Sequence, residues 1–186
     1  MKRHALVIVL LTGLIGMVLR SDALIAESGP APLGTLKEIC DVSPLIIEAD
    51  VQSVFPVFAA GTNGPVSGPL VTDYLLNVNR VIKGPNPGRQ IVIGELGGIL
   101  GERKEVVDHK MPLAVGQRYI LFLKPYAPKT WVSRGEIARF ASASRDPSIL
   151  IVGNSVRLAS NSKLRSLYEG VSVTQMLSEI QARLAH

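Results

Sequence analysis

The side chains that most often carry out catalysis are few and far apart in this sequence. Downstream of residue 23 it contains one cysteine, Cys40, and two histidines, His109 and His186. A serine nucleophile of the common hydrolase type needs a Gly-x-Ser-x-Gly turn, and that pattern does not occur. Cys40 shares an apolar helical face with Leu36 and Ile39, which predicts a buried side chain, with a nucleophile or an intermolecular bridge as the alternative. We therefore expect no catalytic residue.

A metal or phosphate site has equally little support. His109 would need carboxylates such as Glu102, Glu105 and Asp108 to complete a set of metal ligands. The glycine-rich stretch Gly94–Gly101 fits neither the dinucleotide spacing nor the phosphate-loop spacing. The sequence therefore predicts no cofactor and no metal. A hydrolase with paired carboxylates remains open as an alternative.

The N-terminus has the pattern of a signal peptide. Basic residues from Lys2 to His4 precede an apolar run from Ala5 to Leu19, which is short for a membrane-spanning helix. Small residues follow this run and predict where the signal peptide is cleaved. The preferred site is Ala23–Leu24, and the second is Ala26–Glu27. The alternative is an uncleaved anchor. We expect export to the periplasm or the medium, with no membrane insertion after cleavage.

Cleavage reduces the charge of the chain. The full sequence has 20 basic and 15 acidic residues, and removal of residues 1–23 leaves 17 basic and 14 acidic residues, a net charge of +3. The basic residues are scattered and are not interleaved with aromatic residues. The sequence therefore argues against a nucleic-acid partner and leaves an extracytoplasmic protein as the partner that we expect.

The first half of the mature chain predicts a short helix followed by strands. Thr35 and Glu38 form a capping box that opens the helix, which ends at Ser43-Pro44. Apolar residues then alternate with polar ones from Leu45, which indicates a strand covered on one face. Further strands are expected over 71–83 and 90–96. Arg80 breaks the alternation of the first of these, so we predict a bulge or a switch of faces near Asn79.

The second half contains a strand that must be covered on both sides. Tyr119–Leu123 is continuously apolar, as in a strand without a solvent-facing side. Strands are also expected over 131–140 and over 149–158, where Gly153-Asn154 marks a hairpin turn. A C-terminal amphipathic helix, 172–185, opens with a second capping box at Ser172. Its apolar stripe is our expected cover for Tyr119–Leu123.

Two loops are the candidate ligand sites. Loops carry binding residues more often than the elements they connect. The segments 61–69 and 96–105 are rich in glycine and polar residues, and the residues that we single out in them are Gly61, Asn63, Gly64, Gly97, Gly98, Glu102 and Arg103.

Three segments carry a resemblance to known proteins. The succession of Leu45–Val51, Tyr74–Gly84 and Val115–Leu123 resembles exported bacterial proteins of unknown function. It is more distantly similar to the netrin-like OB-fold domain of tissue inhibitors of metalloproteinases. The resemblance spans residues 35–160 and implies a small OB-like (netrin-like) β-barrel. Those inhibitors place an N-terminal cysteine on the protease zinc, whereas Cys40 is internal here, so inhibition does not carry over.

The expected organisation is a signal peptide over 1–23, a flexible lead over 24–34 and one mostly β domain over 35–186. That domain is a barrel with a short N-terminal helix and a C-terminal helix. The expected function is a non-catalytic binding or interaction module outside the cytoplasm. The alternatives are an extracytoplasmic hydrolase or, by analogy of fold alone, a module like a protease inhibitor.

Overall fold

A closed ring of β-strands forms the centre of the molecule. The computed structural model describes residues 35–58, 68–105, 113–125, 137–144, 148–160 and 162–185. Within these ranges the chain is mostly β, as the sequence predicts, with few helices. The signal peptide, the lead over 24–34, His109 and His186 lie outside the described residues.

The ring has five strands, and the strand at its end pairs again with the strand at its start. Their order around the ring is β1 (Leu45–Phe58), β2 (Leu70–Lys83), β3 (Gln90–Leu96), β7 (Ala138–Ser142) and β6 (Arg118–Pro125). β6 closes the ring on β1, where Leu45 lies opposite Leu123 and Asp50 lies opposite Arg118. β3 and β7 are parallel neighbours, and the other pairs in the ring are antiparallel.

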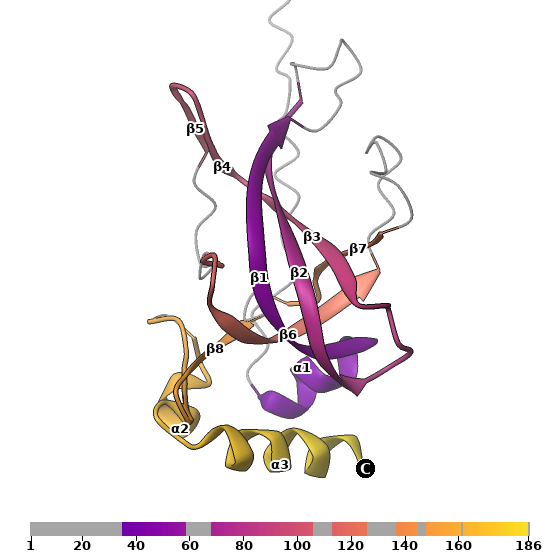
Figure 1. The fold of residues 1–186 in the computed structure, drawn as a ribbon. Helices are drawn as coiled ribbons and strands as arrows, with labels where there is room; N and C mark the ends of the chain where they lie inside the picture. The colour runs from indigo at the N-terminus through magenta and orange to yellow at the C-terminus, as the bar shows by residue number, and fades with distance from the viewer. Residues whose placement is uncertain are drawn as a thin grey trace, which may run out of the picture.

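Two hairpins and three helices surround the ring (Figure 1). The hairpin of β8 (Ser148–Val152) and β9 (Ser155–Arg157) continues from β6, with Gly153-Asn154 at its turn as predicted. The hairpin of β4 (Gly98–Leu100) and β5 (Arg103–Glu105) projects away from the ring in Figure 1. The helices are α1 (Leu36–Val42), α2 (Arg165–Tyr168) and α3 (Val173–Leu184), with α1 and α3 below the ring in the same view.

Side chains cap the N-termini of the two longer helices, and the complete capping box, which the sequence predicts for both helices, forms at α1. Thr35 accepts a hydrogen bond from the amide of Glu38, and the Glu38 carboxylate accepts one from the amide of Thr35. At α3, Ser172 accepts a hydrogen bond from the amide of Gln175. These bonds satisfy amides that the first turn of a helix leaves without partners.

The register of β1 and β2 confirms the switch of faces predicted near Asn79. Glu48 lies opposite Arg80 and Ala49 lies opposite Val78, so Asn79 has no counterpart in β1. One extra residue reverses the side-chain alternation of the strand, because alternation has a period of two. The bulge therefore places Arg80 on the outside of the ring.

β6 is buried on both faces, as its continuous apolar sequence predicts. Tyr119, Leu121 and Leu123 pack inside the ring with residues of β1, β2 and β3. Ile120 and Phe122 belong to a second apolar cluster outside it, and this cluster contains side chains of both α1 and α3. The helix that lies against β6 is α1, and the C-terminal helix, the expected cover, packs on α1 and β9 in the same cluster.

Three elements of the structure differ from the prediction. The strand expected over 131–140 begins at Ala138 and ends at Ser142, and residues 131–136 lie outside the described ranges. The glycine-rich stretch Gly94–Gly101 includes a separate strand, β4, which forms a hairpin with β5. α2 was not predicted. It has only four residues, and no side chain caps its N-terminus.

Candidate functional site

The predicted ligand residues within the described ranges lie on or beside the β4–β5 hairpin. Gly97 accepts a hydrogen bond from the Thr72 hydroxyl at 2.7 Å. Gly98 has a φ of +144°, and a Cβ atom there would lie 2.3 Å from the Thr72 hydroxyl oxygen. This contact gives Gly98 a role in packing. Glu102 and Arg103 are exposed near the turn of the hairpin, where Arg103 pairs with Glu105. Residues Gly61, Asn63 and Gly64 lie outside the described ranges.

A different region brings together more interacting polar side chains. It is the outward side of β1, β2 and β3, opposite to the side chains that fill the ring. We call it the outer face, and it consists of Glu48, Asp50, Gln52, Ser53, Phe55, Val57, Val71, Asp73, Leu75, Asn77, Arg80, Gln90, Val92, Gly94 and Leu96, with Arg118 of β6 and Arg139 of β7.

A buried ion pair lies within the outer face. Arg139 Nη2 lies 2.5 Å from Asp73 Oδ2, and the two side chains are only 12% and 8% exposed. Asp73 is opposite Gly94 and Arg139 is opposite Val92, so the pair bridges β2 and β7 across β3. Gly94 has no side chain to obstruct that bridge.

The second carboxylate oxygen of Asp73 lacks a hydrogen-bond donor. Oδ1 is buried and has no partner in the part of the chain that the structure describes. Leaving a buried polar atom unsatisfied costs about 1–3 kcal/mol, so native proteins rarely do so without a functional or structural reason. The atom has almost no accessible surface, so a ligand could not reach it in this conformation.

Two large apolar side chains on the same face are partly exposed. Phe55 lies directly opposite Asp73 on β1 and is 41% exposed. Leu96 on β3 lies opposite Val71 and is 46% exposed. The charged pair is therefore flanked by apolar surface, a combination typical of binding sites that use a few polar groups to orient a ligand.

Amide side chains continue the outer face along the strands. The Nε2 atom of Gln90 donates to Gln52 Oε1 at 2.9 Å and to Asn77 Oδ1 at 3.0 Å. These three side chains come from β3, β1 and β2 in turn, so they form a row across the sheet.

Beyond the amides lies a network of charges. Arg118 binds Asp50 with two hydrogen bonds, at 2.8 and 3.3 Å. Arg80 donates to Glu48 at 2.6 Å, and Arg118 Nη1 lies 3.6 Å from the same carboxylate. The hydrogen bond from Arg118 lowers the pKa of Asp50, because it stabilises the charged carboxylate. Both carboxylates therefore have arginine partners.

A separate polar group lies inside the ring. Ser142 of β7 donates a hydrogen bond to Glu95 of β3. Burial, together with the charge of Glu95, raises the pKa of Tyr74 to about 12. Glu95 lies opposite Thr72, whereas Asp73 is the next residue along β2 and points to the other face. Asp73 and Glu95 are therefore on opposite sides of the sheet and do not form the paired carboxylates of a hydrolase.

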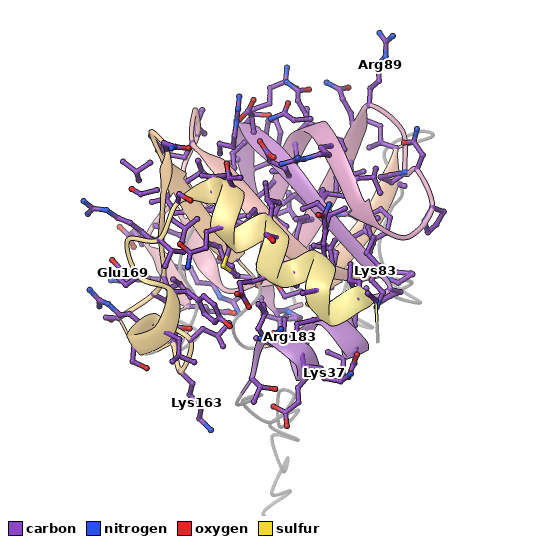
Figure 2. The ribbon with its side chains drawn as sticks, turned by 90° about the horizontal axis from the view of Figure 1, so that it is seen from below. Lys37, Lys83, Arg89, Lys163, Glu169 and Arg183 are labelled. Carbon is purple, nitrogen blue, oxygen red and sulfur yellow. The ribbon has the colours of Figure 1, made fainter. Side chains whose placement is uncertain are left out.

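Basic side chains gather around α1 and the C-terminal half of α3, where Figure 2 labels Lys37, Lys83 and Arg183. Each of the three has a partner. Lys37 binds Asp41 at 2.9 Å, Arg183 binds Glu179 at 3.1 Å, and Lys83 donates to the carbonyl oxygen of Cys40 at 2.6 Å. This end of the molecule is therefore not an obvious anion site.

The described ranges contain no candidate metal site and no candidate membrane-spanning helix. No group of three His, Cys, Asp or Glu side chains there could hold a metal ion. None of the described helices is both long enough and apolar enough to cross a membrane. Cys40 is buried, as predicted, and burial raises its pKa to about 11.

Comparison with known proteins adds no assignment, since no protein-family model matches the sequence and no curated protein matches it significantly. Asp73 and Arg139 are not among the candidates predicted from the sequence. The signal that was available is the acidic residue at 73 in the otherwise uncharged strand segment Leu70–Leu76. A charge within such a segment needs a partner when the strand is buried.

Proposed function

We propose that this protein is an exported, non-catalytic binding module built on an OB-like barrel, and that its ligand binds the outer face. The strand order supports the barrel. An OB-fold is a five-stranded, partly open Greek-key barrel. The ring here also has five strands, in the order β1-β2-β3-β7-β6. It closes because β1 pairs with β6 as well as with β2.

The observation that carries the binding proposal is that two partly exposed apolar side chains, Phe55 and Leu96, flank the Asp73–Arg139 ion pair on one face of the sheet. In OB-folds, the face formed by strands 2 and 3 is a common ligand surface. β2 and β3 are the corresponding strands, and Asp73 lies on β2. The partly exposed Phe55 and Leu96 provide apolar contact on the same face.

A non-catalytic role agrees with the chemistry of this face. Arg139 neutralises Asp73, and Arg80 and Arg118 neutralise Glu48 and Asp50. The hydrogen bond from Arg118 lowers the pKa of Asp50, which makes that carboxylate a poor general base. The outer face is therefore better suited to orienting a ligand than to transferring protons. Export is proposed from the N-terminal sequence pattern.

The test is a titration of isotope-labelled protein followed by amide NMR spectra. The titrant is the soluble extract of the compartment to which the protein is exported. Binding should shift amide signals of β2 and β3, and the variant Phe55→Ser should weaken those shifts. Val115→Ser is the matched control, because Val115 is exposed on the loop before β6 and is not part of the outer face.

Two outcomes would overturn the proposal. In the first, no amide signal shifts, or the shifts map away from β2 and β3. In the second, components of the extract are consumed over time in proportion to the protein added, which would indicate an enzyme.

A further inference from the structure

We propose that β7 is a releasable strand, which leaves the ring while the other ring strands stay folded, and that the Asp73–Arg139 ion pair is its latch. β7 lies between β3 and β6 and completes the ring (Figure 1). This device concerns closure of the ring and is independent of ligand binding on the outer face.

β7 is the least buried strand of the ring. All five of its residues, Ala138–Ser142, are partly exposed. Each of the other four ring strands contributes fully buried side chains to the core, such as Ile46 of β1, Leu76 of β2, Ile91 of β3 and Phe122 of β6. Segments with few buried apolar side chains open locally at a lower cost than the rest of a fold. β7 is therefore the ring strand that opens most easily.

The backbone pairing of β7 is short on both sides. Its register with β3 places Ala138–Phe140 opposite Ile91–Ile93, and its register with β6 places Phe140–Ser142 opposite Leu123–Pro125. The β3–β7 pairing is parallel, which is slightly less stable per residue than an antiparallel one. The antiparallel β1–β2 pairing, by contrast, continues along almost the whole of both strands. β7 therefore has less backbone pairing to lose than β1 or β2.

Two side-chain contacts hold β7 in place, one on each face of the sheet. On the outer face Arg139 forms its ion pair with Asp73 of β2, 2.5 Å away. Inside the ring Ser142 donates a hydrogen bond to Glu95 of β3. The ion pair is the stronger contact, because both partners are charged and largely buried. It also reaches past β3, so it fastens β7 to the long β1–β2 pairing.

The closed position of β7 leaves one buried acceptor without a donor. Asp73 Oδ1 has almost no accessible surface and no hydrogen-bond partner among the described residues. Burying an acceptor without a donor costs free energy, and hydration of the atom recovers it once the strand opens. Asp73 therefore holds β7 through Oδ2 while its Oδ1 atom lowers the free energy needed for release.

Release of β7 changes what the ring presents. The backbone groups of Ile91–Ile93 on β3 and of Leu123–Pro125 on β6 lose their partner, which leaves two strand edges with a slot between them. Unpaired strand edges bind extended segments through main-chain hydrogen bonds. The slot keeps the carboxylates of Asp73 and Glu95, so it selects a strand with the arginine and hydroxyl side chains of β7.

Amide hydrogen exchange, measured by NMR on the chain without its signal peptide, tests the release. Amides of β7 should exchange at least about 100-fold faster than those of the β1–β2 pairing, because a local opening costs less than global unfolding. Their exchange should also respond less steeply to urea, because release of one strand exposes less surface than unfolding. Equal rates and equal urea dependence in the two groups would show that β7 opens only with the whole fold, and would overturn the proposal.

Two variants separate the latch from the rest of the fold. Arg139→Gln should accelerate exchange in β7 at least about tenfold, because it breaks a buried ion pair that exists only in the closed ring. Met176→Ala is the matched control, because it weakens the apolar cluster around α3, which stays intact when β7 is released. It should accelerate exchange in the β1–β2 pairing at least about tenfold and change exchange in β7 by less than about twofold.

The opposite results would overturn the proposal. If Met176→Ala accelerates both groups of amides equally, β7 does not open on its own. If Arg139→Gln leaves exchange in β7 unchanged, the ion pair is not the latch. Should Arg139→Gln fail to fold, Ser142→Ala tests the second contact of β7 without leaving a buried charge, and it too should accelerate exchange in β7.

A peptide supplied in trans tests the slot. The peptide with the sequence of residues 137–144, added to the Arg139→Gln protein, should shift amide signals of β3 and β6. The same peptide with Arg139→Glu should bind at least about tenfold more weakly, because it places a carboxylate beside the buried Asp73. Equal binding of the two peptides, or no shift with either, would overturn the selection of a strand by the slot.

Discussion

Lys83, the last residue of β2, donates a hydrogen bond from Nζ to the carbonyl oxygen of Cys40, 2.6 Å away near the C-terminal end of α1. The last turn of α1 has no basic residue of its own. A positive charge at a helix C-terminus satisfies free carbonyl groups and interacts favourably with the helix dipole. Lys83 therefore supplies from the sheet what the sequence of α1 lacks.

The variant Lys83→Met tests the strength of this contact. It keeps most of the apolar side chain but removes the charge and the donor, so we expect the free energy of unfolding to fall by about 1–2 kcal/mol. Urea unfolding monitored by circular dichroism measures the change. Lys104→Met on the exposed β5 strand is the control and should change stability by less than about 0.5 kcal/mol. Equal effects of the two variants would show that the contact contributes little.

Gly84, the residue after Lys83, should tolerate no side chain. Its φ is +92°, and a Cβ atom there would lie 2.3 Å from the carbonyl oxygen of Pro44. Gly101 also has a positive φ, of +60°, but has no heavy atom within 4 Å of the same position. Gly84→Ala should therefore destabilise the protein by at least about 2 kcal/mol, and Gly101→Ala by about 1 kcal/mol. The difference in urea midpoint isolates the steric clash, and similar midpoints would contradict it.

Local patterns predicted those parts of the fold that depend on neighbouring residues. The capping residues Thr35 and Glu38 predicted the start of α1, because both partners lie within one helical turn. The break in alternation at Arg80 predicted the bulge at Asn79, because side chains in a strand alternate with a period of two. The five apolar residues of β6 predicted burial on both faces.

The candidate site depends on contacts between distant segments, which leave no local pattern. Asp73 and Arg139 are 66 positions apart in the chain. They meet because β3 lies between β2 and β7, and this strand order follows from closure of the ring. The glycine-rich loop attracted attention in the sequence because of its composition, but Gly98 is explained by its close approach to Thr72.

The thiol of Cys40 should make stability depend on pH in the alkaline range. In an unfolded chain the thiol ionises near its ordinary pKa of 9.0, whereas burial raises the pKa to about 11 in the folded protein. Above the lower value the unfolded state releases a proton that the folded state retains. The neutral thiol therefore makes its full contribution to the free energy of unfolding below pH 9.0, and this contribution is lost as the pH rises toward 11. The loss is on the order of 2 kcal/mol.

Comparison with Cys40→Ala isolates this effect from the titration of lysines and tyrosines. The difference in unfolding free energy between the two proteins should shrink as the pH rises through this range. A bulky thiol reagent at pH 8 should also react slowly with the native protein and rapidly in denaturant, because the thiolate is the reactive form. A constant difference across this range, or rapid native labelling, would contradict the burial of Cys40.

Export predicts a defined N-terminus. Protein recovered from outside the cytoplasm should lack residues 1–23, or residues 1–26 if the second site is used. Intact-mass measurement distinguishes the two products, and replacement of Ala23 by a bulky residue should shift cleavage to the second site. Recovery of material that retains Met1 would contradict cleavage and would favour the N-terminal anchor.

The two faces of β6 should behave as separate cores. Leu121 packs inside the ring, whereas Phe122 packs outside it in the cluster that contains Met176 of α3. Both are almost fully buried, so Leu121→Ala and Phe122→Ala should destabilise the fold by about 2–5 and 3–5 kcal/mol, respectively. Urea unfolding of single and double variants with Met176→Ala then tests the separation.

Residues in one cluster share cavities and relax together. The losses of unfolding free energy caused by Phe122→Ala and Met176→Ala should therefore depart from additivity by at least about 0.5 kcal/mol. Leu121 and Met176 belong to different clusters. The losses of unfolding free energy caused by Leu121→Ala and Met176→Ala should therefore add to within about 0.5 kcal/mol. The Leu121 pair is thus the internal control for the Phe122 pair, since it alters an adjacent residue on the same strand. Additivity in both pairs would mean that α3 does not help to cover β6.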